Sequence, residues 1–143
     1  MAVVFRNVTG SPSDPVMTWP YEGLVTVLEE GYVADWQPIV AEIRRSPWGA
    51  VARKVEQYCS YTEEKALAAL FTHIIARSRS RWETAEREAV AGRVRAAIEA
   101  SGLTAAEFAL VIGTSASRLS TYVSGKVTPS AAMLVRIERV AEL

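Results

Sequence analysis

The stretch TAAEFALVIGTSASRLSTYVSGKVTP, residues 104–129, constrains the fold of this chain more than any other part. Thr104 and Glu107 have the spacing of a capping box, so the sequence predicts a helix that begins at Ala105. Gly113 is where this helix should end, because glycine adopts the left-handed conformation of a helix C-terminus without steric cost. The stretch therefore opens with one short, well-delimited helix.

A second short helix should follow the glycine turn. Thr114 and Ser115 are both good N-caps, so we expect this helix to begin at about Ala116 and to end at Gly125. Two short helices around a glycine turn have the geometry of the helix-turn-helix that reads DNA, and a hairpin used only for core packing is the alternative. Helical spacing places five residues on the inward side of the pair: Phe108, Ala109, Ile112, Leu119 and Tyr122.

The same region resembles a known family. The residues that carry the resemblance are Ser101-Gly102-Leu103-Thr104, Glu107-Phe108-Ala109, Ile112-Gly113, Ser115, Arg118-Leu119-Ser120, Tyr122, Ser124-Gly125-Lys126 and Thr128-Pro129. In this order they resemble the helix-turn-helix of the Cro and phage-repressor type, often called Xre-like. The resemblance covers residues 90–143, a little over a third of the chain. A simple hairpin does not require all of these turn residues together.

The resemblance also implies which residues contact DNA. The helix at about residues 116–124 would enter the major groove, and the family often has a glutamine phosphate contact where Ala105 stands here. Arg118 is able to make a bidentate contact with guanine, and a contact with phosphate alone is the alternative. The implied base-reading residues are Ala116, Ser117, Arg118 and Thr121, and the implied phosphate contacts are Ser115, Ser124 and Lys126.

The charge balance limits how strongly one copy can bind nucleic acid. The chain has 16 basic and 16 acidic residues, so its net charge is zero, although residues 90–143 hold six basic and four acidic side chains. Non-specific DNA binding is mostly neutralisation of phosphates, so we expect modest affinity for each subunit. A homodimer is therefore predicted, and Val123, on the helix face opposite the predicted core, is an apolar candidate for its interface.

Other function classes have little support in the sequence. Cys59 is the only cysteine, so an intramolecular disulfide is impossible, and His73 is the only histidine. No set of metal ligands, phosphate loop or nucleophile with a nearby base is present, so we predict neither an enzyme nor a cofactor. No apolar run has the length of a membrane span and no signal peptide is visible, so the predicted location is the cytoplasm, away from membranes.

The N-terminal part begins with a predicted irregular arm, residues 1–17, because SPSDP at 11–15 cannot hold regular structure. Within it, Val3-Val4-Phe5 is a candidate for an edge strand or for an apolar strap over the helices. The alternative is a flexible arm that enters the minor groove of DNA, with Arg6 as its basic residue.

Two helices are predicted next. The first is capped by Thr18 or Trp19 and ends at Gly31, and the second is capped by Asp35 and ends with Arg44-Arg45. Spacing predicts that their buried sides hold apolar residues only, namely Leu24, Val25, Val27, Leu28, Ile39, Val40 and Ile43.

Two further helices are predicted to start at Ser46-Pro47 and near Thr62. The predicted inward faces are Trp48, Val51, Ala52, Val55 and Cys59 in the third helix, and Leu67, Leu70, Phe71 and Ile74 in the fourth. The four tryptophans of the chain are interpreted as rings that hold helix ends to a small core, and an aromatic ligand pocket is the alternative.

No stop signal follows the fourth helix, so a long or once-bent helix that runs as far as Ser101 is predicted. Arg77, Arg79 and Arg81 are interpreted as a solvated linker paired with Glu83 and Glu86, and contact with phosphate is the alternative. The last helix is predicted to open at Thr128-Pro129, with Met133, Leu134, Ile137, Val140 and Ala141 facing inward.

The predicted fold class is therefore all-α. It comprises the arm, an N-terminal helical domain at 18–75, a helical linker at 76–89 and an Xre-like domain at 90–143. The function implied by the resemblance is sequence-specific binding of double-stranded DNA and regulation of transcription. The alternative is an antitoxin-like or adaptor protein that binds a partner protein through residues 18–75.

Overall fold

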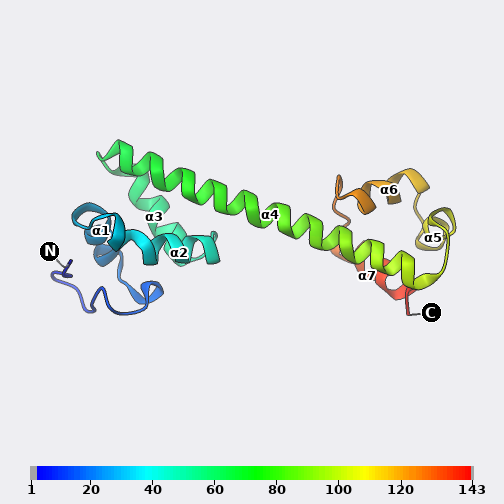
Figure 1. Ribbon diagram of the computed structural model, residues 1–143, viewed down its shortest axis with the longest axis horizontal. Coiled ribbons are helices and arrows are strands. Elements are labelled where there is room, and N and C mark those ends of the chain that lie inside the picture. The colour runs from blue at the N-terminus through cyan, green and yellow to red at the C-terminus, as the bar shows by residue number, and fades with distance from the viewer. Residues whose placement is uncertain (1–2, 143) are drawn as a thin grey trace. The chain divides into compact units, whose positions relative to one another are not determined.

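The computed structural model describes residues 3–142 of the chain, and within them it contains helices and no strand (Figure 1). This confirms the all-α prediction. Residues 1 and 2 of the predicted arm, and Leu143 at the end of the predicted Xre-like domain, lie outside the described residues. The elements are the 3-10 turns η1 (Val16–Thr18) and η2 (Val33–Trp36), and the helices α1 (Tyr21–Glu30), α2 (Gln37–Arg45), α3 (Ala50–Tyr61), α4 (Lys65–Ser101), α5 (Ala105–Ile112), α6 (Ala116–Ser124) and α7 (Ala131–Val140).

The chain forms two compact units, which divide between Arg81 and Trp82 inside α4. Unit 1 contains α1, α2, α3 and the first part of α4, and unit 2 contains the rest of α4 with α5, α6 and α7 (Figure 1). Helix α4 is unbroken from Lys65 to Ser101, which agrees with the absence of a stop signal in the sequence. Residues 80–89 of this helix are all exposed, so neither core draws on this segment.

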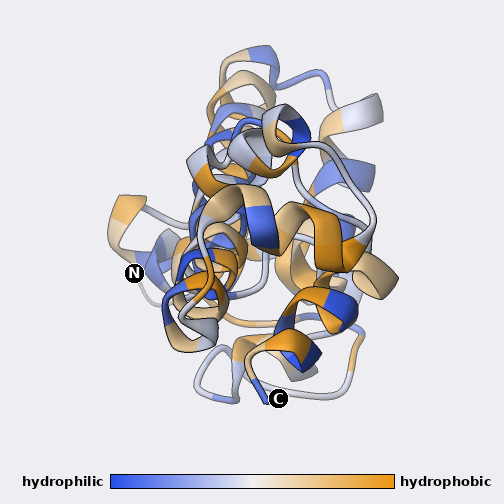
Figure 2. Ribbon diagram, turned by 90° about the vertical axis from the view of Figure 1, so that its right-hand side faces the viewer, coloured by the Kyte–Doolittle hydropathy of each residue, from blue (hydrophilic) through white to orange (hydrophobic). Residues whose placement is uncertain are grey.

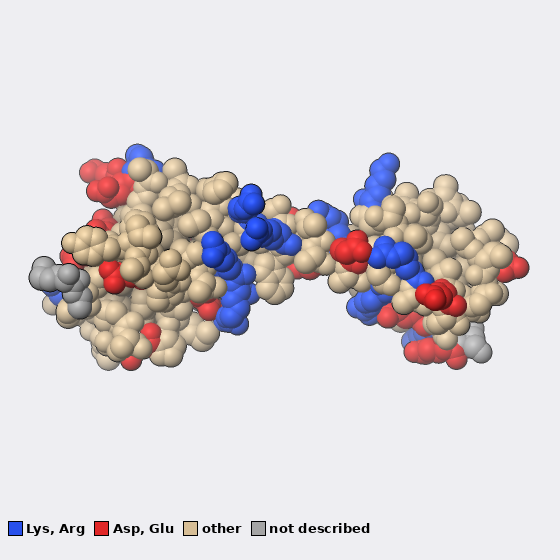
Figure 3. Space-filling model, viewed as in Figure 1, with Lys and Arg blue, Asp and Glu red and all other residues tan. Residues whose placement is uncertain are grey.

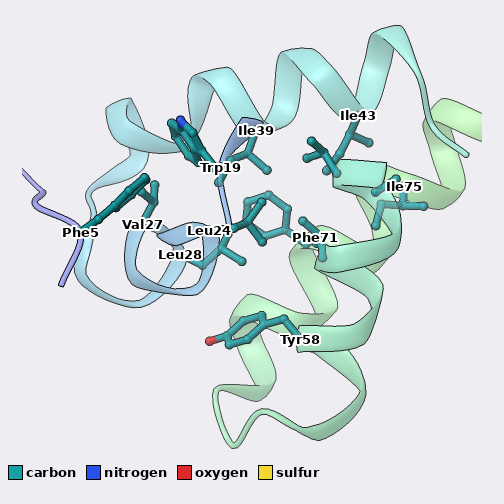
Figure 4. Close-up of a cluster of buried hydrophobic side chains, with 13 residues drawn as sticks. Phe5, Trp19, Leu24, Val27, Leu28, Ile39, Ile43, Tyr58, Phe71 and Ile75 are labelled. Atoms are coloured by element: carbon teal, nitrogen blue, oxygen red, sulfur yellow. The ribbon is translucent and has the colours of Figure 1, made fainter. Parts of the chain in front are cut away.

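The core of unit 1 is an apolar cluster drawn from every helix of the unit (Figure 4). Phe71 from α4 is fully buried, and Trp36 meets its ring edge to face at 5.7 Å. The buried members are Phe5, Trp19, Leu24, Val27, Leu28, Ile39, Ile43, Val51, Ala52, Val55, Tyr58, Phe71 and Ile75. Most of the apolar positions predicted for α1, α2 and α3 therefore face this core, with Val25, Val40 and Cys59 half-buried at its edge.

The N-terminal segment packs on this core as an apolar strap. Phe5 is buried and meets the ring of Trp19 edge to face, with ring centroids 5.4 Å apart. Gly23 in α1 allows this approach, since a Cβ there would lie 2.9 Å from the Phe5 ring. Residues 3–5 form no strand, so of the forms predicted for this segment the structure shows the strap.

Local hydrogen bonds move several helix starts away from their predicted positions. Thr18 is not the cap of α1, because its hydroxyl donates to the Pro15 carbonyl at 2.6 Å inside η1, and Pro20 takes the N-cap position. Asp35 does not cap α2, because its carboxylate accepts from the Tyr32 amide at 2.7 Å and so caps η2. Thr18 and Asp35 each form a hydrogen bond within a 3-10 turn, and the spacing of apolar residues in the sequence does not reveal these turns.

The start of α3 also differs from its prediction. Ser46 and Pro47 open a turn in which the Gly49 amide donates to the Ser46 carbonyl at 3.0 Å, and the helix begins only at Ala50. Trp48 lies in this turn and is 43% exposed, so its predicted place on the inward face is wrong. The turn bends the chain before Trp48 can join the helical face.

Helices α4 and α7 begin later than predicted as well. Thr62 ends α3, and its hydroxyl accepts from the Glu64 amide at 3.2 Å, so α4 begins at Lys65. The buried stripe of α4 in unit 1 is Ala68, Phe71, Ile75 and Ser78, whereas Leu70, predicted inward, is exposed. Helix α7 is capped by Ser130, whose hydroxyl accepts from the Met133 amide at 3.1 Å, and not by Thr128.

The interpretation of the arginines of α4 needs a correction too. Arg79 forms its ion pair with Glu56 of α3, not with Glu83 or Glu86. Its Nε also donates to the Pro47 carbonyl at 2.9 Å, because the first part of α4 packs against the turn before α3. Arg79 is thus part of the packing of unit 1.

Unit 2 has its own core, built around α5, α6 and α7. Its buried residues are Val94, Ala97, Phe108, Ala109, Ile112, Leu119, Tyr122, Ile137 and Val140, with Ile98, Leu103, Val123, Met133, Leu134 and Ala141 packed at the edge. Hydrophobic and hydrophilic residues alternate along the helices, as expected where each helix buries one side (Figure 2). The inward faces predicted for α5, α6 and α7 are confirmed, but Val123 is half-buried in this core, so its predicted place on the opposite face is wrong.

Among the described residues, no helix combines the length and the apolar character that crossing a membrane requires.

Candidate nucleic-acid interface

The first helix of the candidate site, α5, begins at a complete capping box. The Thr104 hydroxyl accepts from the Glu107 amide at 3.2 Å, and the Glu107 carboxylate accepts from the Thr104 amide at 2.9 Å. The helix ends at Gly113, which has a left-handed backbone at φ 78° and ψ 37°. Both ends of α5 are therefore confirmed as the sequence predicts, and the left-handed glycine turns the chain towards α6.

The second helix, α6, is fixed at both ends as predicted. The Ser115 hydroxyl accepts from the Arg118 amide at 3.1 Å, and Gly125 ends the helix in a left-handed conformation. Leu119 is 0% exposed and Tyr122 is also buried, so these two side chains hold one face of α6 against the core. The opposite face is consequently presented to solvent in a defined orientation.

The exposed face of α6 carries most of the predicted base-reading residues. Ala116, Ser117 and Arg118 are exposed and Thr121 is half-buried. The Thr121 hydroxyl donates to the Arg118 carbonyl at 2.6 Å, so towards a ligand its oxygen is left mainly as an acceptor. All four residues lie within two turns of one short helix, which is the arrangement that a major-groove helix requires.

The Arg118 side chain has a partner that sequence reasoning did not identify. Its Nε donates to the Tyr122 hydroxyl at 3.1 Å, one turn along α6. The two terminal nitrogens of the guanidinium remain able to donate to an acceptor pair such as that of guanine. The sequence could have indicated this contact, because residues four positions apart are neighbours on a helix surface.

The predicted phosphate contacts lie at the two ends of α6. The hydroxyls of Ser115 and Ser124 differ in whether they are free to donate to a phosphate. Ser115 accepts from an amide, which leaves its own O–H able to donate. Ser124 donates to the Thr121 carbonyl at 3.2 Å and accepts from the Lys126 amide at 3.3 Å, so its hydroxyl is already used in ending the helix. Lys126 is exposed in the loop that follows α6.

Several other arginines of unit 2 are used inside the unit. Arg93 pairs with Glu138 of α7, and Arg95 pairs with Glu88 at 2.7 Å. Arg95 also donates to the Val123 carbonyl at 2.8 Å, which ties the end of α6 to α4, and Arg136 donates to the Ile112 carbonyl at 3.2 Å. Arg95 thus positions α6, while Arg93 and Arg136 hold α7 against α4 and α5.

Residues 94–142 match a family model described as helix-turn-helix. They form an Xre-like helix-turn-helix domain. The match covers about a third of the chain, and it coincides with the part that carries α5, the glycine turn and α6. Searches of curated proteins and of solved structures gave no match.

The helix-turn-helix family that residues 94–142 match is a family of DNA-binding regulators. The histidine of the chain, His73, lies outside this domain and is exposed. Among residues 3–142, no group of three or more histidine, cysteine or acidic side chains is arranged to hold a metal ion. The geometry of α5 and α6 points to DNA binding.

Proposed function

We propose that the protein is a sequence-specific DNA-binding regulator of transcription, which reads the major groove of double-stranded DNA with α6. The observation that carries the proposal is the fixed orientation of α6. Leu119 and Tyr122 anchor one face of the helix, while Ala116, Ser117 and Arg118 lie exposed on the other. A regulator of this kind acts where the DNA is, so we place it in the cytoplasm.

The side chains take different roles in this proposal. Arg118 makes a bidentate contact with guanine, while Ala116 offers apolar contact to a thymine methyl group. Ser117 and Thr121 complete the base-reading set. Ser115 and Lys126 contact phosphates, and Ser124 joins them by turning its hydroxyl from the Thr121 carbonyl to a phosphate oxygen. Base contacts give the sequence preference, and phosphate contacts fix the register.

Selection of bound fragments from random duplex DNA, followed by sequencing, tests the proposal. Enrichment of a common motif is the expected result. On the enriched duplex, Arg118→Ala should cost about 1–3 kcal/mol and relax the preference at one base pair. Lys126→Ala should weaken binding evenly across sequences and lower the salt slope by about one unit. Arg139→Ala, an exposed arginine of α7, is the matched control and should bind as wild type.

We further propose that the protein binds DNA as a homodimer. Exposed apolar side chains in the helix-turn-helix domain support this, since Leu110 is 80% exposed and Val111 and Val135 are also largely exposed. Leu110 and Val111 lie on α5 and Val135 lies on α7, and these helices pack together. Two copies would read half-sites roughly 34 Å apart. Sedimentation that shows a 15.6 kDa species alone, with and without DNA, would contradict the dimer.

The second candidate is an antitoxin-like or adaptor protein that holds a partner protein through residues 18–75. Tyr32 and Val33, which are 70% and 66% exposed in η2, favour it, because they present apolar surface outside the core of unit 1. A small toxin-like reading frame beside this gene would support the second candidate. The absence of any enriched motif at low salt would favour it over the regulator.

A further inference from the structure

Unit 1 separates its charges along the chain. Up to Arg81 it holds nine basic and nine acidic residues. Seven of the nine basic residues fall in two segments, 44–54 and 77–81, and these segments contain no acidic residue. Unit 1 is therefore neutral as a whole but has a strongly basic part.

The fold brings the two basic segments together. The Arg79 Nε donates to the Pro47 carbonyl at 2.9 Å, so residues 77–81 of α4 lie against the turn between α2 and α3. Figure 3 shows Lys and Arg side chains gathered on one face of unit 1, where α2 ends and α4 passes it. We use the name arginine cluster for the arginines of the two segments, which are Arg44, Arg45, Arg53, Arg77, Arg79 and Arg81.

Two arginines of the cluster are paired with acidic residues. Glu42 pairs with Arg45 at 2.6 Å, and Glu56 pairs with Arg79. Arg53, Arg77 and Arg81 are exposed and take part in neither pair. The seventh basic residue of the two segments, Lys54, does not belong to the cluster, because its Nζ donates to the Trp19 carbonyl at 3.0 Å.

Two arginines of the cluster, Arg53 and Arg79, lie at an open hollow. Trp48, Arg53, Glu56 and Arg79 line this hollow. Three of these four side chains are cationic or aromatic. Such side chains suit a polyanionic partner better than an apolar partner. Guanidinium groups also match the geometry of phosphate oxygens, to which they donate in pairs.

We propose that the arginine cluster is a second DNA contact, which binds phosphates of the duplex without reading sequence. Like charges held together on one surface repel, and a polyanion relieves that repulsion. Unit 2 has seven basic and seven acidic residues and two of its arginines are ion-paired, so α6 has little phosphate affinity of its own. The choice of DNA as the polyanion rests on the proposed function of the helix-turn-helix domain.

The test measures binding of the full chain to a random-sequence duplex at several salt concentrations. The cluster variant is Arg53→Gln with Arg77→Gln. The control variant is Lys65→Gln with Arg139→Gln, which removes the same charge outside the basic segments. Each lost phosphate contact lowers the slope of log K against log salt by about 0.9. We expect the cluster variant to lose about two units of slope and the control variant to keep the slope of the wild type.

Two outcomes overturn the proposal. A cluster variant with the slope and affinity of the wild type overturns it. A control variant that loses as much slope as the cluster variant also overturns it, since the effect would then come from net charge alone. If the cluster variant melts earlier than the wild type, Arg53→Gln and Arg77→Gln are measured singly, each with an expected loss of about one unit.

Failure of the helix-turn-helix proposal would look different. In that case no duplex is enriched over random sequence and Arg118→Ala binds as the wild type does, while the cluster variant still loses slope on the random duplex. If instead the enriched duplex is bound normally and the cluster variant is unchanged on it, the cluster proposal alone fails.

Discussion

The Arg118 guanidinium donates from Nε to the Tyr122 hydroxyl at 3.1 Å, one turn apart on α6. Tyr122 is a buried residue of the unit 2 core, so its hydroxyl has a fixed position at the edge of that core. The hydrogen bond therefore orients the only arginine on α6 while its terminal nitrogens remain available. Preorganisation of this kind lowers the entropy that a side chain loses on binding.

Tyr122→Phe removes this hydroxyl and keeps the ring in the core. We expect binding to the enriched duplex to weaken by about 0.5–1.5 kcal/mol, the usual worth of one hydrogen bond, and the preference at the base read by Arg118 to relax. Fluorescence anisotropy on duplexes that vary at one base pair measures both effects. Tyr32→Phe, at an exposed tyrosine of unit 1, is the control. An unchanged base preference would show that Arg118 does not depend on Tyr122.

Leu119→Asp should unfold unit 2, because it places an unpaired carboxylate where the leucine is fully buried. The matched control is Leu70→Asp on α4, where the leucine is exposed and the change should stay within about 0.5 kcal/mol. Thermal melting of the full chain followed by circular dichroism compares the two variants. Equal melting curves would mean that the two leucines do not differ in burial.

Gly113→Ala should destabilise the protein by about 1–2 kcal/mol, because alanine is strained at the left-handed φ of 78° that ends α5. A Cβ at Gly113 would meet nothing within 4 Å, so the loss of stability would come from backbone strain and not from a steric clash. Gly92→Ala in α4 is the opposite case. There the nearest heavy atom would be the Arg95 guanidinium at 3.7 Å, so alanine should stabilise α4 by about 0.5–1 kcal/mol. Urea titrations of both variants should show shifts of opposite sign.

Cys59 should react slowly with iodoacetamide in the folded protein. Burial raises the pKa of the Cys59 thiol above its ordinary value, and only the thiolate reacts. The folded state therefore disfavours ionisation of the thiol. The contribution of the neutral thiol to the free energy of unfolding is complete at a pH below the ordinary pKa, and it is lost as the pH rises through the folded pKa. Alkylation rates in buffer and in urea should differ most in that window. Equal rates at each pH would contradict the shift.

The capping and glycine signals of the candidate site could be predicted from the sequence because they act locally. Thr104, Gly113, Ser115 and Gly125 have the roles that their positions indicate, since each contact joins residues within a few positions of each other along the chain. The inward register of Phe108, Ile112 and Leu119 follows from helical spacing for the same reason. The ends of α5 and α6, and the exposed face of α6, were therefore determined by the sequence alone.

The tertiary structure decided what depends on contacts between distant residues. Arg79 pairs with Glu56, 23 positions away, in place of its helical neighbours, and Trp48 is exposed because the turn before α3 bends the chain. Val123 is not one of these cases, because it lies four residues after Leu119 and helical spacing alone places it beside the core. The basic segments around residues 44–54 and 77–81 are far apart in sequence, and the packing of α4 against the turn before α3 brings Arg79 of one against Pro47 of the other. Such contacts depend on which helices meet, and that follows from the burial of the whole core rather than from any local pattern.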